Sequence, residues 1–109
     1  MSVVLTEDRG PVRTVIINRE ETGNYLNLEV IQSLTAAFRA VNTDEDVRVV
    51  VLRGAGTQAF SSGVDLPGSV ESGVDPKVLA GHVPMYTEAF TEMFEAMGEC
   101  RTPVIGMVF

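Results

Sequence analysis

The chain has 109 residues, of which 45% are hydrophobic, and a formal net charge of −7. This length suits one small domain or part of a larger one. The acidic balance, with no basic cluster, argues against nucleic acid or an anionic membrane surface as a partner. No apolar run approaches the roughly 20 residues of a membrane span, and the acidic N-terminus lacks the apolar core of a signal peptide. A single cysteine excludes an internal disulfide, so we expect a cytoplasmic protein.

The first two segments predict a β-hairpin. Residues 3–6 and 12–18 are rich in β-branched side chains, and residues 7–11 between them include Gly10 and Pro11, which favour a turn. The second segment is apolar nearly throughout, which is typical of a strand that is covered on both faces.

A helix is predicted next, because Asn27 is a suitable N-cap for a helix that runs through Asn42. Apolar side chains recur there at spacings of three and four, which gives the helix one apolar face. They are Leu28, Ile31, Leu34, Phe38 and Val41. Another β-branched strand follows at residues 47–52, so the order strand, helix, strand predicts a parallel pair joined by a crossover.

The rest of the chain predicts a long loop, a helix and a strand. Glycine and proline are frequent from 54 to 84, as in irregular segments. A helix is expected over about 85–98, where a stripe of Met and aromatic side chains is typical of core packing. Residues 103–109 predict a third buried strand. Because such a strand normally leads into a covering helix, we interpret residues 1–109 as the N-terminal part of a single larger domain.

The stretch "RGAGTQA" after the strand at 47–52 raises an alternative. Gly54, Gly56 and Ala59 match the G-x-G-x-x-A pattern of dinucleotide-binding loops, in which the amides at the start of a helix bind the pyrophosphate. Two serines, two glycines and a proline follow within residues 60–68, which argues against a helix there. A Rossmann-type dinucleotide binder therefore remains only an alternative.

Five motifs occur in order within the segments "VRTVIINREETGNYLNLEVIQSLTAAF", "DVRVVVLRGAGTQAFSSGVDL" and "TPVIGMV". They are Ile17-Asn18-Arg19, Asn24 to Asn27, Asp46 to Gly54, Phe60 to Leu66 and Pro103 to Val108. Together they resemble the crotonase family, also called the enoyl-CoA hydratase/isomerase family. The resemblance runs from about Val12 to Val108 and weakens over residues 67–100. It implies an α/β fold with that family's ββα-superhelix core and mainly parallel strands, truncated here after the third buried strand.

The resemblance also implies a site for an acyl-CoA thioester, which is a substrate rather than a bound cofactor. In the family, the turn Ser62-Gly63-Val64-Asp65 presents a backbone N–H, carried over to Val64. This N–H donates to the thioester carbonyl and stabilises an enolate in an oxyanion hole. Gly63 beside it lets the chain approach the ligand closely. The slot for coenzyme A would be lined by Tyr25, Leu26, Ser62, Gly63, Val64, Asp65 and Leu66.

Residues around this slot allow more than one role. Arg19 suits either a contact with the CoA phosphates or a surface salt bridge. Asn24 suits either the slot or a turn, and Asn27 suits a helix cap. Tyr25 and Val64 stand where the family usually has alanine, which reshapes the adenine side and adds bulk near the acyl group.

Other parts of the family's chemistry have no counterpart in these residues. The family's second oxyanion amide and its catalytic carboxylates lie beyond the last strand, so no general base can be assigned. Asp65, Glu71 and Asp75 match no catalytic position. His82 is expected in the long loop, and Cys100 is expected to be an inert packing residue. The sequence contains no metal-ligand cluster.

The first hypothesis is therefore an enzyme that acts on an acyl-CoA thioester, with hydration of a 2-enoyl-CoA or double-bond isomerisation as the default reaction, as in fatty acid metabolism. The isolated 109 residues are expected to be inactive. A non-catalytic CoA-binding or assembly module is the second hypothesis, and a dinucleotide binder is the third. For a full-length protein, the resemblance implies a homotrimer or a hexamer.

Overall fold

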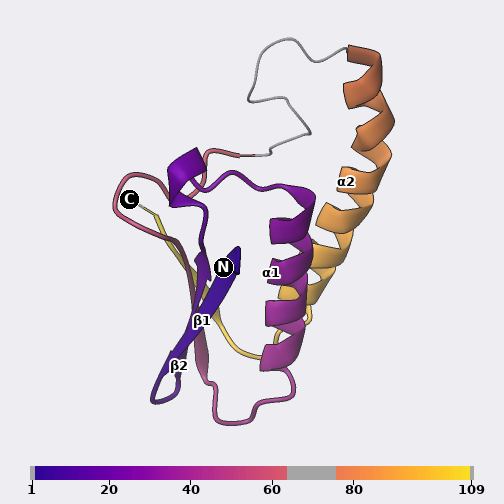
Figure 1. Ribbon diagram of the computed structural model, residues 1–109. Helices are drawn as coiled ribbons and strands as arrows, with labels where there is room; N and C mark the ends of the chain where they lie inside the picture. Colours follow the sequence, from indigo (N-terminus) through magenta and orange to yellow (C-terminus); the bar gives the residue numbers. More distant parts are fainter. Residues whose placement is uncertain (1, 64–75, 109) are drawn as a thin grey trace.

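Residues 2–63 and 76–108, which the computed structural model describes, form an α/β fold with one mixed sheet (Figure 1). In chain order the elements are β1 (Val4–Arg9), β2 (Val12–Ile17), the 3-10 helix η1 (Glu20–Thr22), α1 (Leu28–Val41), β3 (Val49–Gly54), α2 (Pro76–Gly98) and β4 (Val104–Met107). The strand order is β1-β2-β3-β4. β1 and β2 are antiparallel, whereas β2–β3 and β3–β4 are parallel. The predicted hairpin and the predicted parallel crossover are both confirmed.

The hairpin closes at Gly10, whose φ of 58° lies in the left-handed region that favours glycine. Near this turn the Arg13 guanidinium contacts Asp8 at 2.8 Å and Asp44, in the turn after α1, at 2.7 Å. The hydrogen bond from Arg13 lowers the pKa of the Asp8 carboxyl below its ordinary value. Arg13 therefore links the hairpin to the C-terminal end of α1.

Helix α1 begins immediately after its cap residue, Asn27. The Asn27 side chain accepts a hydrogen bond of 2.9 Å from the Val30 N–H, and its backbone has the extended conformation of an N-cap. The apolar face of the helix packs on a core that includes Val15 and Ile17 of β2. Its buried apolar residues are Val30, Ile31, Leu34, Phe38 and Val41. The predicted cap and apolar face are confirmed, although Leu28 is only half-buried.

Helix α2 begins at Pro76, well before the predicted start near Met85. Proline suits the first turn of a helix, where its missing N–H has no intrahelical partner. Pro84 lies inside the helix, where proline removes a hydrogen bond and usually breaks the pattern. Packing against the core from Tyr86 onward outweighs this local preference. The buried side chains recur at spacings of three and four and are Tyr86, Ala89, Met93 and Ala96.

Strand β4 is the edge strand beside β3 and is mostly exposed, so the expectation of a third buried strand is wrong for this chain. Ile105 and Met107 are 54% and 43% exposed, and Phe94 of α2 is 61% exposed. Only Val104 packs partly against the core. Apolar composition indicates what a strand is able to bury, whereas burial depends on the elements that lie over it.

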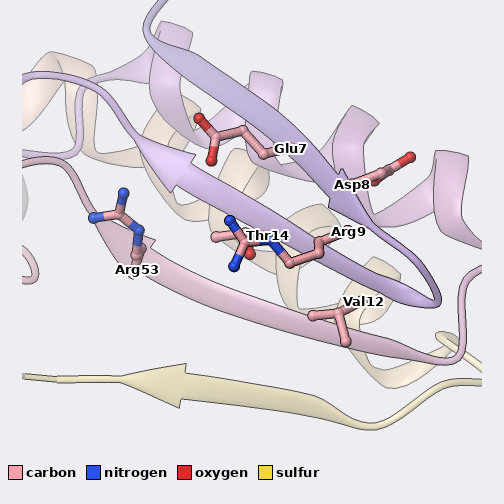
Figure 2. A pocket seen from close by; sticks show the side chains of 6 residues that line it. All are labelled: Glu7, Asp8, Arg9, Val12, Thr14 and Arg53. Carbon is pink, nitrogen blue, oxygen red and sulfur yellow. The ribbon is translucent and has the colours of Figure 1, made fainter.

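The helices cover one face of the sheet and leave the other open. Figure 2 shows the helices behind the sheet. A pocket of about 700 Å³ lies on the other face. Glu7 and Arg9 of β1, Thr14 of β2 and Arg53 of β3 line it. Because both charge signs are mixed there, this face lacks the single-signed field that attracts a charged ligand. Among the described residues, no helix combines the length and the apolarity that a membrane span requires.

Replacement of Asn27 by Ala should lower the free energy of unfolding by about 1 kcal/mol, because the Val30 N–H loses its acceptor. Asn27→Ser retains a capping oxygen and serves as the control, with little expected loss. Urea unfolding followed by far-UV circular dichroism measures both variants. Equal stability of Asn27→Ala and the unchanged chain would contradict the role of this cap.

Candidate functional site

Two loops meet at the edge of the sheet where β2 and β3 end. We call residues 18–27 the β2 loop and residues 55–63 the β3 loop. Because β2 and β3 are parallel, their C-terminal ends share one edge, and Ile17 is paired with Gly54 there. Loops held in this way by a rigid sheet and helix are common positions for binding sites.

Backbone hydrogen bonds join the two loops. The Ser62 N–H and the Ser62 hydroxyl both donate to the Gly23 carbonyl, at 3.0 and 2.9 Å. The Leu26 N–H donates to the Gly63 carbonyl at 2.8 Å. Gly23 has a φ of 75°, and a Cβ on it would lie 2.6 Å from the Ser62 Oγ. The left-handed backbone favours glycine here, and a side chain would also displace the Ser62 hydroxyl from the Gly23 carbonyl.

A buried asparagine lies between the loops. Asn24 is 1% exposed and has a φ of 58°, a conformation that asparagine tolerates better than most residues. Its Oδ1 accepts from the Arg19 N–H at 3.0 Å, and its Nδ2 donates to the Ala55 and Ala59 carbonyls at 3.1 and 2.9 Å. The sequence predicted only a slot or turn residue here, because a local pattern carries no signal for bonds to residues more than 30 positions away.

Gly54 and Gly56 allow protein segments to pack closely. A Cβ at Gly54 would overlap the Phe60 carbonyl oxygen. Gly56 has a φ of 77°, and a Cβ there would overlap the Glu20 carboxylate. No helix begins within the β3 loop. A pyrophosphate at this position would meet a carboxylate instead of helix amides, which argues against the Rossmann-type alternative.

An apolar cavity of about 210 Å³ adjoins both loops. Leu26 of the β2 loop and Phe60 of the β3 loop form part of its wall, together with Leu52 of β3. Phe90 and Phe94 of α2 also line it, with stacked rings whose centroids lie 5.9 Å apart. Its described lining is apolar, so the cavity suits an apolar group and offers a polar group no side-chain hydrogen bond.

The structure brings several predicted site residues together and leaves others undescribed. Those brought together are Tyr25, Leu26, Ser62 and Gly63. Those outside the described residues are Val64, Asp65, Leu66, Glu71 and Asp75. Within residues 2–63 and 76–108, no group of three or more His, Cys, Asp or Glu is arranged to hold a metal ion.

Three further candidates occupy defined positions. The Arg19 guanidinium donates to the Tyr25 carbonyl at 2.9 Å, within the β2 loop itself. His82 lies in α2 and not in a loop, because that helix begins earlier than predicted. Cys100 is half-buried with its Sγ 3.4 Å from the Phe38 carbonyl, and burial raises the pKa of the thiol. A raised pKa keeps this thiol neutral and unreactive.

The mixed sheet, with α1 and α2 on one face and two loops joined at its edge, defines an α/β protein. A solved structure of an enoyl-CoA hydratase/carnithine racemase from Magnetospirillum magneticum aligns with 100% of this chain at a TM-score of 0.83 and 29% identity. Residues 12–108 match the profile of the enoyl-CoA hydratase/isomerase family. The chain therefore belongs to this family, as its motifs predict, and its fold matches the N-terminal part of crotonase structures.

The match between this chain and its curated relatives covers only part of each relative's length. The Delta(3,5)-Delta(2,4)-dienoyl-CoA isomerase of Mus musculus is 30% identical over 112 residues, covering 98% of this chain and 34% of that protein. The (E)-benzylidenesuccinyl-CoA hydratase of Thauera aromatica is 41% identical over 63 residues, covering 58% of this chain and 25% of that protein. The chain also spans 39% of the Magnetospirillum structure. It thus spans well under half of each of these relatives.

Replacement of Gly54 by Ala should destabilise the chain by about 1–3 kcal/mol, because the new methyl group overlaps the Phe60 carbonyl. Gly106→Ala in β4 is the matched control, since a Cβ there meets nothing within 4 Å. Chemical unfolding of the two variants provides the comparison. An unchanged stability of Gly54→Ala would mean that the β3 loop does not pack as described.

Proposed function

We propose that residues 1–109 are the N-terminal part of a single crotonase-like domain that binds an acyl-CoA thioester. In this proposal, the Val64 backbone N–H donates to the thioester carbonyl. It stabilises the enolate that forms when a 2-enoyl-CoA is hydrated or its double bond is isomerised. The observation that carries the proposal is the 2.8 Å hydrogen bond from the Leu26 N–H to the Gly63 carbonyl.

Peptide geometry connects this hydrogen bond to the proposed donor. The Gly63 carbonyl and the Val64 N–H belong to one peptide plane, and in a trans peptide they point in opposite directions. The hydrogen bond that holds the Gly63 carbonyl therefore restrains the peptide to which the proposed donor belongs. The hydrogen bond also polarises the peptide, which strengthens its N–H as a donor. Loss of one oxyanion donor typically costs about 3–4 kcal/mol of transition-state stabilisation.

The same loops supply the proposed contacts with coenzyme A. Backbone groups of Tyr25 and Leu26 would line one side of the slot, and the turn from Ser62 to Leu66 would line the other. The hydrogen bond from Arg19 holds the Tyr25 carbonyl in place and so supports this side of the slot. The names of the relatives, a dienoyl-CoA isomerase and a benzylidenesuccinyl-CoA hydratase, support a CoA thioester as the ligand. The apolar cavity beside both loops supports an apolar acyl group.

The reaction of a full-length protein needs groups that these residues do not supply. The family resemblance implies a second oxyanion amide and catalytic carboxylates beyond the Pro-Val-Ile strand, and an assembly of three or six subunits. One amide donor stabilises an enolate only in part, and the carboxylates of Asp65, Glu71 and Asp75 match no catalytic position of the family. We therefore propose that the 109-residue chain binds the thioester weakly and does not turn it over.

Binding of acetoacetyl-CoA tests the ligand class. We expect acetoacetyl-CoA to raise the melting temperature of the chain and NAD to leave it unchanged. At a concentration about tenfold above its Kd, the thioester should stabilise the fold by about 1.4 kcal/mol. Stabilisation by NAD alone would overturn the proposal.

Two glycine variants provide a matched control for that measurement. Gly63 and Gly10 both have positive φ, 104° and 58°, and a Cβ on either meets nothing within 4 Å among the described residues. Both Gly63→Ala and Gly10→Ala therefore strain a turn without a clash. Only Gly63→Ala should weaken the binding of acetoacetyl-CoA. Equal affinities of the two variants would place the ligand away from the Ser62–Gly63 turn.

The purified 109-residue chain should show no hydration of crotonyl-CoA above the rate in buffer, because the resemblance implies that the family's catalytic carboxylates lie beyond the last strand. The loss of crotonyl-CoA absorbance in the ultraviolet measures the reaction. An unrelated acidic protein at the same concentration serves as the blank. Turnover by the chain would show that these residues form a complete active site.

A further inference from the structure

The Asn24 side chain joins three backbone segments with three hydrogen bonds. It binds the N–H of Arg19, just after β2, and the carbonyls of Ala55 and Ala59 in the β3 loop. The amide thus uses its acceptor oxygen once and both of its donor hydrogens, while the residue is 1% exposed. A left-handed turn alone does not require this, because glycine adopts such a φ without any side chain.

The contacts on either side of Asn24 reach the Ser62–Gly63 turn. Gly23, the residue before Asn24, accepts both hydrogen bonds from Ser62. Leu26, two residues after it, donates to the Gly63 carbonyl. The position of these partners depends on where the β2 loop lies relative to the β3 loop. Asn24 is the buried side chain that bonds to both.

We propose that Asn24 is a positioning residue that holds the Gly63 carbonyl against the Leu26 N–H, and thereby sets the direction of the peptide that follows Gly63. Asn24 does not touch the ligand. Its effect on the ligand rests on the proposed function, since that peptide carries the proposed oxyanion donor. Its effect on the loops stands on the geometry of the described residues alone.

Two variants separate the shape of Asn24 from its hydrogen bonds. Asn24→Gly retains the left-handed conformation and removes all three bonds. Asn24→Asp retains the shape but replaces the donor to Ala55 and Ala59 with an oxygen that repels both carbonyls. Asn42→Ala is the matched control, because the Asn42 side chain also joins two segments, through Glu99 and Arg101, at the far end of α1.

Amide hydrogen exchange of the 109-residue chain gives the first readout. We expect exchange at Leu26 and Ser62 to become about tenfold faster or more in both Asn24 variants, while exchange at Phe38 in α1 changes far less. Asn42→Ala should leave Leu26 and Ser62 unchanged. Unchanged exchange at Leu26 and Ser62 in Asn24→Gly would overturn the proposal. A uniform acceleration that includes Phe38 would also overturn it, because Asn24 would then act only on global stability.

The thioester carbonyl of bound butyryl-CoA, labelled with ¹³C at that carbon, gives the second readout. Hydrogen bonding polarises a carbonyl and moves its ¹³C resonance downfield. This shift should be present when butyryl-CoA is bound to the unchanged chain or to Asn42→Ala. It should be smaller with Asn24→Gly, measured at a concentration of butyryl-CoA that saturates this variant. An equal shift in both variants would overturn the link to the ligand. If the unchanged chain does not bind butyryl-CoA or acetoacetyl-CoA, the proposed function fails, and the exchange measurement still decides the role of Asn24.

Discussion

The structure of the candidate site depends on the contact between two loops that are far apart in the sequence. Most backbone N–H and C=O groups of the β2 and β3 loops lie outside strands and helices. Where such a group is buried, it needs a hydrogen-bond partner. Each loop supplies hydrogen-bond partners to the other, through the Gly23 and Gly63 carbonyls and the side-chain amide of Asn24. Glycine at position 23 makes this possible because a side chain there would hold the loops apart. Hydrogen bonds between the loops therefore hold the turn at Ser62 and Gly63, beside the apolar packing of Leu26 and Phe60 on the core.

The sheet and α1 make that contact possible. Parallel pairing brings the ends of β2 and β3 to one edge, and the crossover through α1 is what allows parallel pairing. Asn27 caps α1 one residue after Leu26, so the start of the helix also fixes the end of the β2 loop. Tyr86 reinforces this point, because the Leu28 N–H donates to its hydroxyl at 3.2 Å. Helix α1 thus anchors the β2 loop and contributes to the apolar core. Helix α2 packs on that core and bonds to the start of α1 through Tyr86.

Local patterns predicted the elements whose causes are local. The cap at Asn27 and the apolar face of α1 follow from residue type and spacing. The start of α2 did not follow, because Pro84 is typical of a loop and only packing of the helix on the core outweighs it. The exposure of Ile105 in β4 depends on neighbouring elements, which composition does not describe. For the site, the motifs indicated the family and the Ser62–Gly63 turn. The hydrogen bonds of Asn24 reach residues more than 30 positions away, so the sequence alone did not predict them.

The glycine pattern after β3 illustrates why a motif alone does not determine its ligand. Glycines at positions 54 and 56 indicate only that something approaches the backbone closely, and the chemistry of that neighbour decides the ligand. In a dinucleotide site the neighbour is a phosphate, and the surrounding backbone presents N–H groups. Here the neighbours are the Ala59 and Phe60 carbonyls and the Asn24 side-chain nitrogen at Gly54, and the Glu20 carboxylate at Gly56. The oxygens repel an anion, and the Asn24 nitrogen already donates to the Ala55 and Ala59 carbonyls. The loop leaving β3 therefore has the wrong electrostatic sign for a pyrophosphate.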